Sequence, residues 1–251
     1  MNPFWNGLKP VRCLDLSRKD VLDYLDSIME TAINEWGFRY LKLDFMYAGM
    51  RFGNFSEKGS AFEFYQRAIK LLTKRKTTKD GKQVFYLGCG VPMEQSFKCF
   101  PLSRIGCDTL EHWKNKKMRF IRWNGRNEAY LNLKDTLARS FWDKTIFAND
   151  PDVIFIREKN CTLTENEKLL IAQVNAIFGS QIMYSDDVND EQTENEKAFT
   201  KKIFELYKKY KNEEFSVQET EDDFYKIESR SGNYKGTIDL RNGKNHEIKI
   251  D

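Results

Sequence analysis

Histidine and cysteine are scarce in this chain, and their positions exclude the common metal and disulfide frameworks. The sequence has two histidines, His112 and His246, and five cysteines, none of which form a Cys-x-x-Cys pair. Two histidines are too few for a histidine-based metal site, and an odd number of scattered cysteines does not favour a zinc site or a disulfide framework. A reducing compartment is therefore the expected environment.

Long hydrophobic runs and an excess of one charge are also lacking. No window approaches the roughly 20 apolar residues of a membrane span, and residues 1–7 contain no apolar core of signal-peptide length. Lysine plus arginine number 41 against 38 for aspartate plus glutamate, a net charge of +3, whereas a nucleic-acid binder carries a larger excess or a basic stripe. We predict a cytoplasmic protein with no membrane partner and no nucleic-acid partner.

What the chain does contain is enough apolar material for a folded core. It has 251 residues, of which 40% are hydrophobic and 14% aromatic, too many for a disordered segment. This length suits one large domain or two small ones.

Apolar strand-like runs alternate with helical runs, which is typical of a parallel sheet built from βα units. A helix is expected from an N-cap at Ser17 to a stop at Gly37, and two capping boxes, Thr164 with Glu167 and Thr193 with Glu196, begin two later helices. Two further helices are expected at 61–76 and 128–140, and strands at 40–45, 84–88, 103–107, 145–149 and 181–187.

After Lys211 the period changes, and residues 215–217, 224–227 and 237–240 read as antiparallel strands separated by glycine turns. About five βα units cannot close an eight-stranded barrel. We therefore predict an α/β fold: the C-terminal part of a (β/α)8 (TIM) barrel over residues 1–212, then the start of an antiparallel β domain over 213–251.

The strand at 40–45 carries two charges on one face. Side chains alternate along a strand, so Lys42 and Asp44 share a face opposite Leu41 and Leu43. In a barrel strand they point inward, with Asp44 at the carboxyl end, where barrel active sites form. A lysine so placed favours an ionised carboxylate, as a nucleophile requires. A structural ion pair or an edge strand with a wet face explains the same pattern, and the pattern favours neither reading.

A second acid, Asp108, follows the strand at 103–107, two βα units downstream of Asp44. Two acids at the ends of separate strands suit glycoside hydrolysis, with one as nucleophile and the other as proton donor. Such pairs are also common by chance.

Six sequence blocks, in order, carry a resemblance to one family. The segment Gly37–Phe45 resembles the nucleophile strand of glycoside hydrolase family 36, the α-galactosidases of melibiase type. Five further blocks are similar to the same family: Leu14–Ser17, Leu87–Pro92, Arg104–Thr109 with Trp113, Asn149–Asp152, and Ser185–Asp187.

The resemblance implies two catalytic carboxylates and several sugar contacts. Asp44 matches the family's nucleophile and Asp108 its general acid/base. Sugar-binding positions are matched by Lys42, Cys89, Arg104 and, with a slightly long spacing, Trp5. Asp150 and Asp152 match a block that supports the pocket floor. Read without the family, Cys89 is a small buried hydrophobe and Trp5 a core or interdomain aromatic.

The function that the resemblance implies is a retaining α-galactosidase. It hydrolyses terminal α-linked galactose from oligosaccharides through a covalent glycosyl-enzyme, without a cofactor or metal. Family members carry a β-sandwich and three barrel strands before the nucleophile, so we expect a truncated or split product that is inactive alone. A homo-oligomer or a complementing N-terminal chain would then be its partner. An α-N-acetylgalactosaminidase, a transglycosylase or a non-catalytic remnant remain alternatives.

Overall fold

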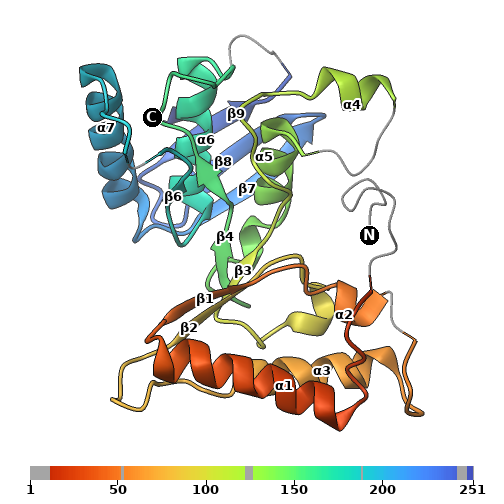
Figure 1. The fold of residues 1–251 in the computed structure, drawn as a ribbon. Helices are drawn as coiled ribbons and strands as arrows, with labels where there is room; N and C mark the ends of the chain where they lie inside the picture. Colours follow the sequence, from red (N-terminus) through yellow and green to blue (C-terminus); the bar gives the residue numbers. More distant parts are fainter. Residues whose placement is uncertain (1–11, 52–53, 122–126, 188, 242–247, 251) are drawn as a thin grey trace. The chain divides into compact units, whose positions relative to one another are not determined.

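The structure, a computed structural model, describes residues 12–51, 54–121, 127–187, 189–241 and 248–250. Its contacts divide the chain into two compact units, Met1–Arg104 and Ile105–Asp251. Figure 1 labels the helices and strands of both. Among the described helices, none is both long and apolar enough to cross a membrane.

The first unit contains three parallel strands with two long helices on one face (Figure 1). In sheet order, the strands are β1 (Tyr40–Leu43), β2 (Phe85–Gly88) and β3 (Leu102–Arg104). The helices are α1 (Lys19–Glu30), α2 (Ala48–Arg51) and α3 (Ala61–Leu72), with a π-helical turn at Thr31–Glu35 and a 3-10 turn at Glu94–Ser96. The two long helices and the strands follow the periodicities read from the sequence.

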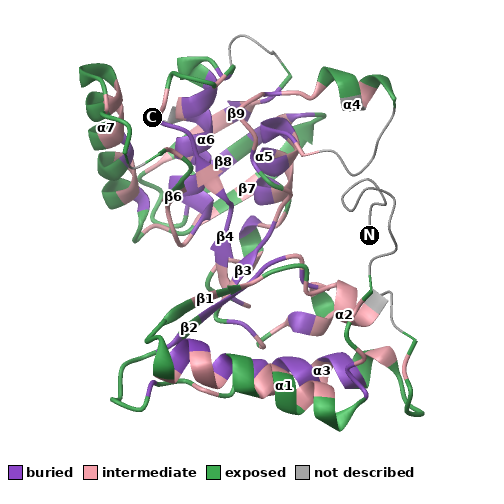
Figure 2. Ribbon diagram, viewed as in Figure 1, coloured by how far each residue is buried: buried purple, intermediate pink, exposed green. Residues whose placement is uncertain are grey.

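The core of the first unit lies between these helices and the sheet. The apolar residues of α3 recur at helical spacing, and Ile69 packs with Ile33 and Tyr86, all three without exposed surface. Figure 2 shows the buried residues of α3 and β2, whereas α1 is mostly exposed or intermediate and buries only Met29. Full burial of a side chain of this size stabilises the fold by about 1.5–3 kcal/mol.

The predicted start of α1 is wrong. The helix begins at Lys19 with Arg18 as its N-cap, and no side chain caps it. The Ser17 hydroxyl donates instead to the Asp15 carboxylate (2.6 Å), which also accepts from the Ser56 backbone amide (2.9 Å). Hydrogen bonds from Ser17 and then Ser56 hold the pKa of Asp15 well below its usual range. The Ser17 hydroxyl also accepts from the Glu57 amide at 3.2 Å, so it helps to join two segments that are distant in sequence.

The second unit combines two short parallel strands with an antiparallel sheet. The parallel pair is β5 (Val153–Ile154) with β6 (Met183–Tyr184), and the antiparallel order is β10 (Ile248–Ile250), β9 (Lys235–Asp239), β8 (Phe224–Ser229) and β7 (Phe215–Glu221). A further strand is β4 (Ala148–Asp150), and a 3-10 turn spans Ser140–Trp142. The helices are α4 (Lys116–Phe120), α5 (Ala129–Ala138), α6 (Glu165–Phe178) and α7 (Glu194–Tyr210).

The core of the second unit joins α5 and α6 to the antiparallel sheet. Leu133 of α5, Val174 of α6 and Ile238 of β9 have no exposed surface and belong to one apolar cluster. Both predicted capping boxes are present, with the Thr164 and Thr193 hydroxyls accepting from the third helical amides. These caps fix where α6 and α7 begin.

Parallel strands followed by an antiparallel sheet confirm the predicted order of the fold. The antiparallel strands begin at Phe215. The domain boundary between residues 212 and 213 stays a prediction.

Candidate active site

Lys42 of β1 and Asp44, which directly follows the strand, lie on the face opposite the core, as the alternation predicts. Leu41 and Leu43 pack against the apolar cluster of the first unit, whereas the Lys42 and Asp44 side chains are 39% and 44% exposed. The Lys42 Nζ lies 4.0 Å from the Asp44 Oδ2. An exposed pair at this distance contributes little to stability, so the sequence gains little structurally by keeping both charges there.

The backbone turns sharply after Asp44. Phe45 adopts a left-handed φ of +53°, which is unfavourable for a bulky residue, and its amide donates to the Asp44 Oδ1 at 2.6 Å. This bond fixes one carboxylate oxygen and leaves the other toward Lys42. Strained backbone of this kind clusters at functional sites.

Cys89 lies at the end of β2, beside Asp44. Its amide donates to the Leu43 carbonyl (2.8 Å), and its thiol hydrogen-bonds with the Asp44 carboxylate. Burial, and then this bond, raise the pKa of Cys89 to about 12, while the charges of Arg104 and Lys42 act in the opposite direction. The thiol is therefore a protonated donor, more than a small apolar filler.

Arg104 ends β3 and is buried, with 3% of its surface exposed. Its charge acts on the Cys89 thiol. Lys42, Asp44, Cys89 and Arg104 thus gather at the carboxyl ends of β1, β2 and β3. Adjacent parallel strands bring their carboxyl ends to one edge, which is where ligands bind in such sheets. Trp5 lies outside the described residues.

Asp108 lies near the start of the second unit, with its side chain exposed. The Asn127 amide donates to its Oδ2 at 2.9 Å. That Asp44 and Asp108 face one pocket stays a prediction. Asn127 was missed by sequence reasoning, since nothing in a loop asparagine indicates which carboxylate it will contact.

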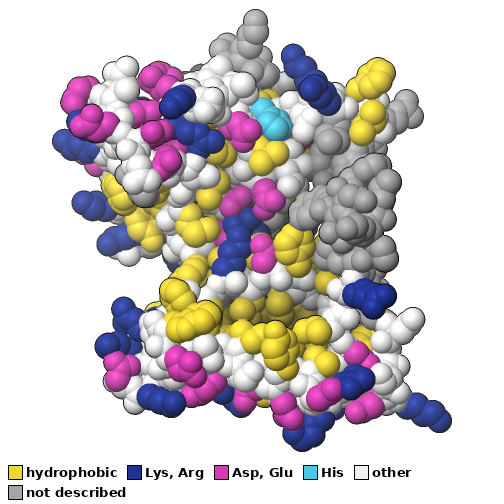
Figure 3. Space-filling model, in the orientation of Figure 1, with side chains coloured by type: hydrophobic (Ala, Val, Ile, Leu, Met, Phe, Trp, Pro, Cys, Tyr) yellow, Lys and Arg dark blue, Asp and Glu magenta, His cyan; other side chains and the backbone are white. Residues whose placement is uncertain are grey.

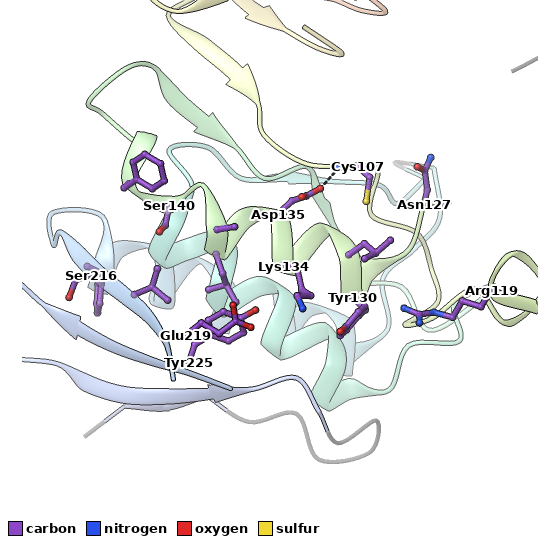
Figure 4. Close-up of a pocket in the computed structure, with 16 residues that line it drawn as sticks. Cys107, Arg119, Asn127, Tyr130, Lys134, Asp135, Ser140, Ser216, Glu219 and Tyr225 are labelled. Atoms are coloured by element: carbon purple, nitrogen blue, oxygen red, sulfur yellow. Dashed lines mark hydrogen bonds between the residues drawn. The ribbon is translucent and has the colours of Figure 1, made fainter. Parts of the chain in front are cut away.

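The second unit contains two larger hollows. One, of about 940 Å³, lies between α5 and strands β7 and β8 (Figure 4), and its lining contains none of the five described residues predicted for the site. The other, of about 810 Å³, lies beside β6 and α7. Side chains of both signs are mixed over the visible face of this unit (Figure 3).

Three acidic residues of the second unit lie close together. The carboxylates of Glu219, Asp222 and Asp223 lie within 4.8 Å of one another. However, the Lys134 Nζ lies 2.7 Å from Asp223 and 3.6 Å from Asp222. This lysine therefore supplies a positive charge to two of the three carboxylates.

The fold of this chain is similar to that of solved α-galactosidase structures. No model of a known protein family matches the sequence. The α-galactosidase of Thermus thermophilus in complex with p-nitrophenyl α-D-galactopyranoside matches with a TM-score of 0.68 and 24% identity, over 88% of this chain and 42% of that one. Its complex with stachyose matches with a TM-score of 0.63 and 23% identity, over 79% and 41%. α-Galactosidase I of Mortierella vinacea matches with a TM-score of 0.56 and 16% identity, over 86% and 55%.

The chain thus spans about two fifths of the length of the Thermus enzyme. At these identities the likeness shows the fold, and it confirms the predicted resemblance at that level. The chain has the fold of part of an α-galactosidase: parallel barrel strands with their helices, followed by antiparallel strands.

Proposed function

We propose that the chain is the catalytic part of a retaining glycoside hydrolase that removes terminal α-linked galactose from oligosaccharides. The observation that carries the proposal is the group formed by Lys42, Asp44, Cys89 and Arg104 at the carboxyl ends of three parallel strands, in a chain with the α-galactosidase fold. The stachyose bound by the Thermus protein supports an oligosaccharide substrate.

In the proposed reaction, Asp44 attacks the anomeric carbon and forms a covalent glycosyl-enzyme. Asp108 protonates the leaving oxygen and then removes a proton from the attacking water. The Lys42 Nζ lies 4.0 Å from the Asp44 carboxylate and the Cys89 thiol hydrogen-bonds with it, so both groups help to orient it. Arg104 offers a rigid fork of donors for sugar hydroxyls. No metal or cofactor enters these steps.

The test uses the native-length protein that contains these 251 residues and an aryl α-galactoside. Asp44→Ala should lower turnover by at least about 10³-fold, because no other group takes over the nucleophile's role. The control is Asp23→Asn, which changes an exposed aspartate of α1 paired with Lys19 and should leave turnover unchanged. Normal turnover by Asp44→Ala, or no turnover by the folded wild-type protein, would refute the proposal.

The stereochemistry gives a second, independent test. A retaining enzyme releases α-galactose first, because two displacements restore the configuration. Proton NMR of the first product distinguishes the anomers within minutes of mixing. Initial release of β-galactose would exclude the covalent intermediate.

A further inference from the structure

A buried asparagine of α5 holds the peptide group that precedes Asp108. The Asn132 side chain has no exposed surface, and its amide donates to the Cys107 carbonyl at 2.7 Å and to the Pro151 carbonyl at 2.9 Å. One side chain therefore joins the segment that carries Asp108 to the turn after β4. A buried amide with two such bonds is costly to replace.

The peptide group that follows Asp108 is held as well. The Thr109 amide donates to the Asp152 Oδ2 at 2.7 Å, and the Asp152 amide donates to the Asp150 Oδ1 at 3.0 Å. Asp152 is buried and has a left-handed φ of +79°. A non-glycine residue keeps such a conformation only where its surroundings impose it.

The close approach of α5 to this segment depends on Gly106. A Cβ there would lie 3.1 Å from the Cβ of Asp135 and 3.3 Å from the amide nitrogen of Asn132. Asp135 also accepts a bond from the Cys107 amide at 3.3 Å (Figure 4). The absent side chain lets α5 bring both residues against the backbone next to Asp108.

We propose that Asn132 and Asp152 are positioning residues for Asp108. They clamp the peptide groups on both sides of it, while the Asp108 side chain remains exposed and contacts Asn127. The inference rests on the proposed function, in which Asp108 is the proton donor. A proton donor must stay within about 3 Å of the leaving oxygen, and a displacement of about 1 Å costs about 100-fold in rate.

The experiment compares two substrates on the native-length protein. Stachyose has a poor leaving group that needs the proton, whereas a dinitrophenyl α-galactoside has a leaving group that departs without it. Asn132→Leu should lower kcat/KM on stachyose by about 100-fold and kcat/KM on the activated substrate by less than about 3-fold, because kcat/KM reports only the steps up to the glycosyl-enzyme and not the later attack of water. The ratio of the two kcat/KM values does not depend on the folded fraction, so partial unfolding cannot mimic the result.

A pair of variants at Asp152 tests whether its acceptor oxygen is what matters. Asp152→Asn keeps an acceptor oxygen and tolerates a positive φ, and it should hold the ratio within about 3-fold of the wild-type value. Asp152→Ala loses the acceptor and should behave like Asn132→Leu. Thr136→Val is the matched control, since Thr136 is also buried in α5 and its hydroxyl donates one bond, to the Asn132 carbonyl; its ratio should not change.

Asp108→Ala separates the two proposals. If it slows stachyose selectively and Asn132→Leu slows both substrates equally, only the positioning inference fails. If Asp108→Ala slows neither substrate selectively, Asp108 is not the proton donor and the proposed function fails with it.

Discussion

At the scale of single residues, the backbone beside both candidate acids is held in strained conformations. Phe45 follows Asp44 with φ +53°, and Asp152, which holds the residue after Asp108, has φ +79°. Each costs about 1–3 kcal/mol. Neighbouring hydrogen bonds compensate for this cost: the Phe45 amide holds one oxygen of the Asp44 carboxylate, and Asp152 holds the backbone that follows Asp108.

Gly90 should be the more sensitive of two glycines with left-handed backbone. Its φ is +56°, and a Cβ there would lie 3.3 Å from Tyr47 and 3.4 Å from the Phe45 backbone. Gly81 has a φ of +81°, and a Cβ added there would meet no atom within 4 Å. A substitution at Gly81 therefore measures only the free-energy cost of placing a side chain on left-handed backbone. We expect Gly90→Ala to lower the free energy of unfolding by about 2 kcal/mol and Gly81→Ala by about 1 kcal/mol. Urea denaturation measures both, and equal losses would contradict the close approach.

Cys89 should react slowly with alkylating reagents. Burial and the bond to Asp44 raise its pKa from 9.0 to about 12, so the reactive thiolate is rarer by roughly 10³-fold below pH 9. Iodoacetamide at pH 8, followed by mass spectrometry, should modify Cys89 far more slowly in the folded protein than in urea. Equal rates in the two states would show that the thiol is neither buried nor bonded to a carboxylate.

The sequence could predict which face Lys42 and Asp44 share, because that face follows from the strand period alone. It could not predict Asn127 or Asn132 as neighbours of Asp108. Their bonds cross 19 to 25 residues and depend on how α5 packs. A polar residue on the apolar face of the expected helix at 128–140 was the available signal for Asn132, and it does not indicate a partner.

At the scale of elements, the sequence predicted helix N-caps correctly where no other group competed for the capping side chain. The capping boxes of α6 and α7 were predicted from their spacing, and α3 has a third, Ser60 with Glu63, that the sequence reading missed. Ser17 was assigned wrongly because Asp15 binds its hydroxyl. A capping residue is thus predictable only if no carboxylate nearby competes for it.

The link between α5 and the antiparallel sheet should be sensitive to acid. The Tyr130 hydroxyl and the Lys134 ammonium both bind Asp223. Burial opposes ionisation of this carboxyl, but the two bonds outweigh it and lower its pKa. The folded chain therefore binds this proton less readily than the unfolded chain. The resulting stability is present above the ordinary pKa of 3.8 and is lost as the pH falls below it.

Asp223→Asn should remove that dependence. It should lower the free energy of unfolding at pH 6 by about 2 kcal/mol, since Lys134 loses a charged partner, and by much less at pH 3. Asp222→Asn is the control, because Asp222 is almost fully exposed and 3.6 Å from Lys134. Denaturation curves at both pH values give the comparison. A loss that is the same at pH 3 and pH 6 would show that the carboxylate charge does not stabilise this link.

At the scale of the whole molecule, the sequence predicted the order of parallel and antiparallel parts because periodicity changes along the chain. It could not predict that contacts divide the chain after Arg104, since such a division depends on packing density between distant segments. The chain spans 42% of the length of the Thermus protein that it resembles.

The exposed edge at β6 should make the isolated 251-residue chain self-associate. Among the described residues, β6 pairs with β5 alone, and Tyr184 on it is 51% exposed beside the equally exposed Phe204. A parallel edge flanked by exposed aromatics is a template for another chain. The weight-average mass from sedimentation should therefore rise with concentration, and Tyr184→Lys should suppress the rise, because a charged edge resists pairing. Tyr24→Lys makes the same charge change at a tyrosine of α1 that is 57% exposed. If it suppresses association as well as Tyr184→Lys does, net charge and not the strand edge controls the assembly.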